Sequence, residues 1–167
     1  MGYEAYQRGD YATALRIFRQ LADQGNASAQ ANLGWMYQNG LGVTQDYAAA
    51  LRWYHKAADQ GYAVAQYNLG FMYEEGKGVT QDYGEALRWY RKAADQGEAL
   101  AQNNLGVMYE YGQGVTQDYV QAHMWSNLAA AGGLNVGALR DRLAKQMTPA
   151  QIAEARRLTR EWKPKGK

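Results

Sequence analysis

The sequence predicts an all-α fold, a right-handed α/α superhelical solenoid of helix-turn-helix repeats with C-terminal capping helices. The first observation is that the dipeptide Asp-Tyr recurs every 36 residues, at 10–11, 46–47, 82–83 and 118–119. The second is that apolar residues between these dipeptides follow the period of an α-helix. A fixed period of this length is typical of stacked supersecondary units that bury a shared core.

The composition of the chain restricts the classes of protein to which it could belong. The chain has 167 residues, 47% of them hydrophobic, so it can bury a core. It has no cysteine, which excludes disulfides and thiol chemistry. A net charge of +2 does not suggest a nucleic-acid partner. No apolar run approaches the roughly 20 residues that cross a bilayer, so we expect no membrane insertion.

We expect one solenoid domain over residues 1–167, beginning with a truncated repeat at 1–25. Full repeats follow at 26–61, 62–97 and 98–133, and capping helices at 134–167. In the first full repeat, the first helix (helix A) packs through Ala29, Leu33, Met36 and Tyr37. The second helix (helix B) packs through Tyr47, Ala50, Leu51, Tyr54, Ala57 and Ala58.

Glycine and aspartate mark the ends of these helices. Gly40 and Gly42 allow positive φ angles between helices A and B, and Gly61 is expected just after helix B. Asp46 and its three copies are predicted N-caps, and Asp82 with Glu85 has the spacing of a capping box.

Gly34, Gly70 and Gly106 lie inside helix A, where glycine costs about 1 kcal/mol relative to alanine. We therefore expect helix A to approach the alanine-rich face of helix B closely at these positions. A leucine in place of Gly70 should force the two helices apart.

The last part of the chain departs from the repeat. The fourth helix B carries His123, Met124, Ser126 and Asn127 at positions that differ in the earlier copies. A helix is predicted over 136–146, and Thr148-Pro149 should open another that runs to Glu161. A basic stretch follows, which we interpret as a solvated helix end and tail rather than an anion-docking patch: Arg156, Arg157, Arg160, Lys163, Lys165 and Lys167.

The unit at residues 63–97, AVAQYNLGFMYEEGKGVTQDYGEALRWYRKAADQG, closely resembles the Sel1-like repeat, a relative of the tetratricopeptide repeat. The match covers about residues 10–133. The resemblance implies that helix A lines a concave side and that the protein acts as an adaptor or scaffold. The segment 5–15 is similar to the first repeat of exported bacterial members. We therefore expect an exported protein, periplasmic or secreted, whose signal peptide is absent from the given sequence, while a cytoplasmic location stays open.

The sequence contains few side chains that could act as a catalytic base, nucleophile or metal ligand. The two histidines, His55 and His123, lie nearly two repeats apart, and each is interpreted as a solvated or packing residue. Ser28 and Ser126 lie in no nucleophile motif. The sequence predicts no enzyme, no catalytic or metal site and no cofactor.

A second stripe along helix A differs between repeats, whereas the packing positions are copied. We predict that this stripe binds a partner, with aromatic side chains as anchors. Its residues are Asn32, Trp35 and Asn39 in the first full repeat, Tyr67, Asn68, Phe71 and Glu75 in the second, and Asn103, Asn104, Val107 and Tyr111 in the third.

Several of these residues have a structural alternative. Trp35 and Phe71 could instead pack between adjacent A helices. Asn32, Asn68 and Asn104 repeat without change, and we interpret them as hydrogen-bonding between repeats. The tryptophans of helix B, by contrast, are predicted core residues: Trp53, Trp89 and Trp125.

The leading functional hypothesis is a monomeric, non-catalytic scaffold that holds a protein or peptide against the A helices. The alternative is an inhibitor or immunity protein that covers the active site of an enzyme or toxin. Cell-wall glycan binding ranks lowest, because a convincing acid and base pair for hydrolysis is lacking.

Overall fold

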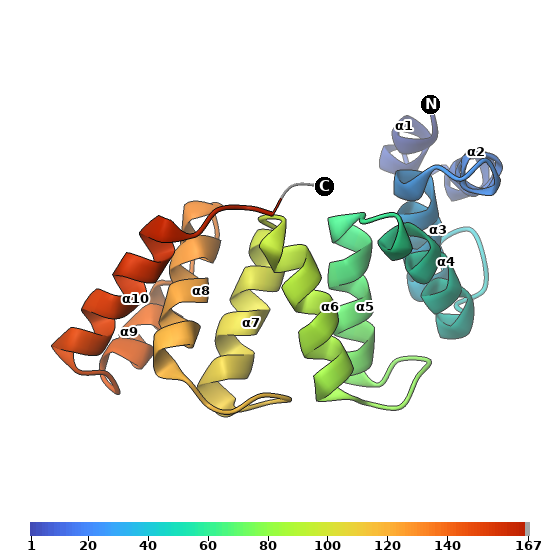
Figure 1. The fold of residues 1–167 in the computed structure, drawn as a ribbon. Coiled ribbons are helices and arrows are strands. Elements are labelled where there is room, and N and C mark those ends of the chain that lie inside the picture. The colour runs from blue at the N-terminus through green and yellow to red at the C-terminus, as the bar shows by residue number, and fades with distance from the viewer. Residues whose placement is uncertain (166–167) are drawn as a thin grey trace. The chain divides into compact units, whose positions relative to one another are not determined.

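The computed structural model describes residues 1–165, which form ten α-helices and no β-strand (Figure 1). The helices are α1 (Gly2–Gln7), α2 (Tyr11–Asp23), α3 (Ala27–Asn39), α4 (Tyr47–Asp59), α5 (Ala63–Glu75), α6 (Tyr83–Asp95), α7 (Ala99–Tyr111), α8 (Tyr119–Ala131), α9 (Gly137–Ala144) and α10 (Pro149–Glu161). The predicted all-α class is confirmed. The expected helices over 136–146 and 149–161 are present as α9 and α10.

The helices fall into two compact units, Met1–Gln81 and Asp82–Lys167. In the first unit, α1 packs on α2 and α3 on α4, while α2 with α3 and α4 with α5 join successive repeats. In the second unit, α6 packs on α7 and α7 on α8, and both α9 and α10 pack on α8. Each unit is thus built from helix hairpins.

Aspartate begins every helix B, as the sequence predicts. Asp10, Asp46, Asp82 and Asp118 each accept a hydrogen bond through Oδ1 from the backbone N–H three residues later. The predicted capping box at Asp82 is wrong in its second half, because the Glu85 carboxylate pairs with Arg88 instead, at 2.6 Å. A complete capping box is found at the start of α10, between Thr148 and Gln151.

The core of each hairpin contains the residues that repeat. Leu33, Met36 and Tyr54 are fully buried in the first unit, as are Leu105 and Met108 in the second. The alanines of helix B are buried with them. Of the three tryptophans expected in the core, two are buried and Trp53 is only half-buried, lying against the core from its edge.

Helix A approaches helix B closely at Gly34, in the α3–α4 hairpin. A Cβ atom at this position would lie 2.7 Å from Cδ1 of the Tyr54 ring, well inside van der Waals contact. The ring cannot easily move away, because its hydroxyl donates a 2.8 Å hydrogen bond to Oε1 of Gln38. The close approach expected at the helix-A glycine is therefore present at Gly34, where the neighbour is a tyrosine ring, and at Gly106, where it is the α8 backbone at Ala122, 3.1 Å from the position of a Cβ atom.

Gly42 closes the loop between α3 and α4. Its φ angle is +68°, in the left-handed region that side chains rarely adopt. A Cβ atom here would also lie 2.7 Å from the carbonyl oxygen of Tyr11. The second glycine of the loop thus allows both the turn and the contact with the preceding helix B.

Buried glutamines join successive repeats. Nε2 of Gln30, Gln66 and Gln102 donates to the carbonyl oxygen eight residues earlier, in the preceding helix B, at 3.1, 3.2 and 3.2 Å. Each of these carbonyl oxygens also accepts from the backbone N–H of the glycine three residues later, so the glutamine adds a second hydrogen bond at the end of helix B and ties it to the next repeat.

α9 contacts the last hairpin, in which a tyrosine is missing. Ser126 stands in α8 where α4 carries Tyr54, and a Cβ atom at Gly106 would lie 3.1 Å from the carbonyl oxygen of Ala122 in α8 and 3.7 Å from Cδ2 of Leu139 in α9. Glu110, the counterpart of Gln38, is buried and forms a two-point ion pair with Arg142 of α9, at 2.6 and 2.7 Å. α9 therefore packs on this hairpin through an apolar contact and an ion pair.

Replacing Gly34 by Ala should lower the free energy of unfolding by about 2 kcal/mol, because the new methyl group meets a fixed ring. Urea denaturation followed by circular dichroism measures this. The matched control is Gly137→Ala, where the nearest atom to a new Cβ is 3.6 Å away. The control should be neutral or stabilising by up to about 1 kcal/mol, since alanine favours helix. Equal stability of Gly34→Ala and wild type would contradict this packing.

Replacing Arg142 by Gln should lower the free energy of unfolding by about 2 kcal/mol, since the buried Glu110 carboxylate loses its cation. A double-mutant cycle with Glu110→Gln should show a coupling of about 1–3 kcal/mol. Arg140→Gln, two residues away on the same helix, should change stability by less than about 0.5 kcal/mol. Additive effects of Arg142→Gln and Glu110→Gln would mean that the ion pair does not hold α9 in place.

Candidate functional site

Trp35 lies on the predicted recognition stripe of α3 and is 41% exposed. Its indole Nε1 donates a 2.9 Å hydrogen bond to the hydroxyl of Tyr6 in α1. Its backbone carbonyl accepts a 2.8 Å hydrogen bond from Nδ2 of Asn39. The side chain is thus oriented by a neighbouring helix while a large part of its surface stays open to solvent.

Tyr6 is the centre of an exposed group that we call the N-terminal aromatic cluster: Tyr3, Tyr6, Tyr11 and Trp35. The rings of Tyr3 and Tyr6 stack with centroids 6.3 Å apart, and Tyr11 meets Tyr6 edge-on at 5.5 Å. Sequence reasoning missed Tyr3 and Tyr6, because the truncated first helix lacks the repeat motif. Trp35 contacts the preceding A helix, as its structural alternative predicts, and also remains 41% exposed, so its role in partner binding stays a prediction.

On α5 the predicted residues differ in exposure. Phe71 is half-buried, and Nζ of Lys77 lies 4.6 Å from the centroid of its ring. Tyr67 is half-buried and Glu75 is exposed. Val64, one helical turn before Asn68, is 43% exposed, so α5 presents both apolar and acidic groups to solvent.

α7, in the second unit, carries the remaining predicted residues. Tyr111 is 60% exposed, and Val107 and Asn103 are half-buried. Leu100 is 44% exposed and aligns with Val64 of α5 in the repeat. The helix-A stripe of this unit is therefore also accessible, with an aromatic ring at its C-terminal end.

The three repeated asparagines do not form the expected bond between repeats. Oδ1 of Asn104 accepts a 3.5 Å hydrogen bond from Asn103, its neighbour on the same helix. Asn68 is buried and makes no side-chain hydrogen bond within residues 1–165, and Asn32 is half-buried. The glutamines described above supply the bonds between repeats instead.

The histidines lie in different surroundings. His55 meets the ring of Tyr73 edge-on, with centroids 6.5 Å apart. His123 is buried in α8, and burial followed by the charges of Arg156 and Arg140 lowers its pKa. Among the described residues, no group of three or more His, Cys, Asp or Glu side chains is arranged to hold a metal ion.

The basic stretch near the C-terminus divides by its contacts. Arg157 forms ion pairs with Glu154 and Glu161 along α10, both at 2.6 Å. Lys165 binds Asp95 at the end of α6 twice, through its backbone N–H and through Nζ, both at 2.7 Å. Lys165 therefore ties the segment after α10 to α6, whereas the Arg157 ion pairs lie within α10.

None of the helices within residues 1–165 is long and apolar enough to cross a membrane.

Comparisons with known proteins identify the repeat. The Sel1 repeat model matches four successive segments, 1–26, 27–62, 63–98 and 99–134. No curated protein matches the chain. Two similar solved structures carry the same repeat, and Sel1-repeat proteins are generally protein-interaction scaffolds.

One is the crystal structure of c5321, described as a protective antigen present in uropathogenic Escherichia coli strains and displaying an SLR fold. It is 40% identical with a TM-score of 0.84, and the match covers 90% of this chain and 32% of that one. The other is a Sel1 repeat protein from Oxalobacter formigenes, 34% identical with a TM-score of 0.81, with 90% of this chain and 61% of that one covered. The chain thus spans less than two thirds of either protein. With the repeat model matching most of its length, the chain belongs to the Sel1-repeat family.

Proposed function

We propose that this protein is a non-catalytic scaffold that binds a protein or peptide partner through the exposed stripes of its A helices. The observation that carries the proposal is Trp35, which is fixed by Tyr6 and yet 41% exposed. A large aromatic side chain that is already oriented loses little conformational freedom when a partner covers it. Such residues are frequent binding hot spots.

The composition of the stripe indicates the kind of partner. α3 and α5 in the first unit, and α7 in the second, contain no lysine or arginine, so the stripe of each helix offers aromatic, aliphatic and amide groups and a few carboxylates. Such stripes suit a segment with apolar anchors flanked by neutral or basic residues. The helices themselves supply no cation to hold a terminal carboxylate, and Lys77, in the loop after α5, lies over the Phe71 ring.

Other exposed apolar groups support the same surface. Within the first unit, Val64 of α5 and Trp35 of α3 are both more than one third exposed. Each stands at a position where the repeats differ, whereas Leu33 and its copies are constant and buried. Variation at such exposed positions is the pattern expected of a surface adapted to one partner.

The double substitution Trp35→Ala and Phe71→Ala should weaken partner binding at least about tenfold, because two anchors are lost. Partners captured from the source cell by the wild-type protein would be identified by mass spectrometry, and their affinity for each variant measured by calorimetry. Leu21→Ala is the matched control, since Leu21 is an exposed apolar residue of α2 in the same unit. Unchanged affinity in a double variant that keeps the wild-type circular dichroism spectrum would refute the proposed surface.

Export is part of this proposal, supported by the similarity of segment 5–15 to the first repeat of exported Sel1-repeat proteins. The intact gene product should therefore appear outside the cytoplasm when cells of the source organism are fractionated. Recovery of all the protein with cytoplasmic markers would contradict export and leave the binding surface unaffected.

A further inference from the structure

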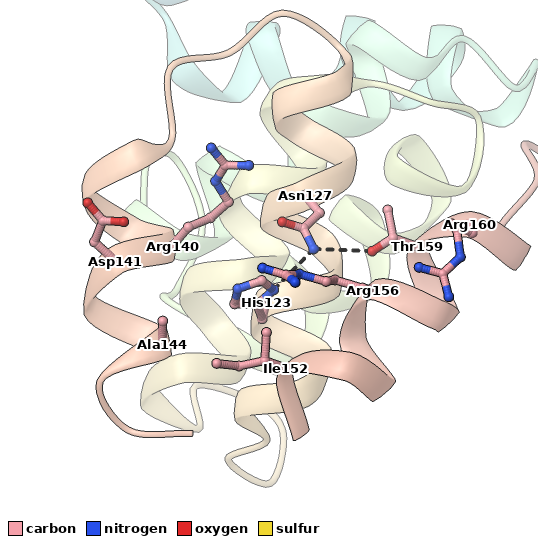
Figure 2. Close-up of a pocket in the computed structure, with 9 residues that line it drawn as sticks. All are labelled: His123, Asn127, Arg140, Asp141, Ala144, Ile152, Arg156, Thr159 and Arg160. Atoms are coloured by element: carbon pink, nitrogen blue, oxygen red, sulfur yellow. Dashed lines mark hydrogen bonds between the residues drawn. The ribbon is translucent and has the colours of Figure 1, made fainter. Parts of the chain in front are cut away.

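A pocket of about 530 Å³ lies in the second unit, between α8, α9 and α10 (Figure 2). Its volume is in the range that binds small organic ligands. The lining residues are His123 and Asn127 from α8, Arg140, Asp141 and Ala144 from α9, and Ile152, Arg156, Thr159 and Arg160 from α10. The residues by which α8 departs from the repeat therefore meet part of the basic stretch in one place.

The arginines of the pocket have no partner in the described part of the chain. Arg140, Arg156 and Arg160 form no ion pair and no side-chain hydrogen bond there, whereas Arg142 and Arg157, on the same two helices, are both paired with carboxylates. Unpaired guanidinium groups gathered around one cavity repel one another, and an anion placed between them removes that repulsion.

The charge of the lining matches a doubly negative group. Three arginines against the single carboxylate of Asp141 leave two net positive charges, with His123 neutral. Figure 2 shows the Asp141 carboxylate directed away from the other labelled side chains. A phosphate monoester carries between one and a half and two negative charges near neutral pH, about the charge the lining needs.

The polar side chains that α8 contributes to the pocket are hydrogen-bonded to each other and to α10. Nδ2 of Asn127 lies 3.1 Å from Nδ1 of His123 and donates to Oγ1 of Thr159 at 3.4 Å (Figure 2). In the imidazole tautomer whose Nδ1 accepts from this amide, the proton is on Nε2, which can donate to an oxyanion. Thr159 is fixed in turn by its 2.8 Å bond to the Ala155 carbonyl.

We propose that this pocket binds a small organic phosphate monoester, with the phosphate among the guanidinium groups and the organic part toward Ala144 and Ile152. Guanidinium groups bind phosphate oxygens through paired hydrogen bonds, which gives the site geometric selectivity as well as charge. The cavity is larger than a phosphate ion alone would need, and its apolar lining suits a carbon skeleton. This site is independent of the partner surface proposed for the A helices.

The test uses the full chain and phenyl phosphate as probe, with binding measured by calorimetry. Arg156→Gln should weaken binding about tenfold, the effect of losing one charge-assisted contact. Arg157→Gln is the matched control, because it removes the same charge from the same helix outside the pocket, and it should change affinity less than about twofold. Equal losses in the two variants would show attraction by net charge only and would overturn the proposal. Melting temperatures confirm that both variants are folded.

Two further readouts define the ligand. Phenol should not bind, and inorganic phosphate should bind more weakly than phenyl phosphate; equal affinity for the two phosphates would overturn the ester assignment. In proton NMR titrations, phenyl phosphate should raise the pKa of His123, since an anion offsets the charges of Arg156 and Arg140, which lower it. His55, the other histidine of the chain, lies outside the pocket and should not respond. A probe that leaves the His123 signal unmoved would place binding elsewhere.

Discussion

The contact between the glycine of helix A and the tyrosine of helix B fixes the geometry of the hairpin on which the rest depends. Gly34 lets the two helices approach until its backbone touches the Tyr54 ring. The hydroxyl of that ring then reaches Gln38 and satisfies a polar group in the core. Burial raises the pKa of Tyr54, so the phenol stays protonated and donates. One glycine therefore allows both close packing and a satisfied buried hydrogen bond.

In the α7–α8 hairpin the tyrosine of this glycine–tyrosine contact is missing. Ser126 removes the ring beside Gly106, and the nearest neighbour of this glycine is then the α8 backbone, with the Ala122 carbonyl oxygen 3.1 Å from the position of a Cβ atom. Leu139 of α9 packs beside this contact, and the Arg142 guanidinium of α9 pairs with the buried Glu110 carboxylate. α9 thus packs where a further copy of the repeat would otherwise stand. The same departure from the repeat brings His123 and Asn127 against α10, where the arginine-lined pocket forms.

Much of the fold could be predicted because the repeat gives the same local signal several times. The Asp N-caps, the glycine loops and the apolar stripes each report a local preference of the backbone, and the copies agree with one another. The candidate surface was predicted less completely. Trp35 was identified because its position varies among repeats, whereas Tyr3 and Tyr6 lie in a helix too short to show the motif. The asparagines were misassigned, because a residue that repeats can be constant without contacting the next repeat.

The sequence by itself determined the helices, their caps and the residues of the hairpin core, since these follow from local preferences and a strict period. Only the tertiary structure decided which side chains far apart in sequence meet. It brought Tyr6 to Trp35, Arg142 to Glu110 and Arg156 to His123. Such pairs depend on the packing of whole helices, and no spacing along the chain encodes them.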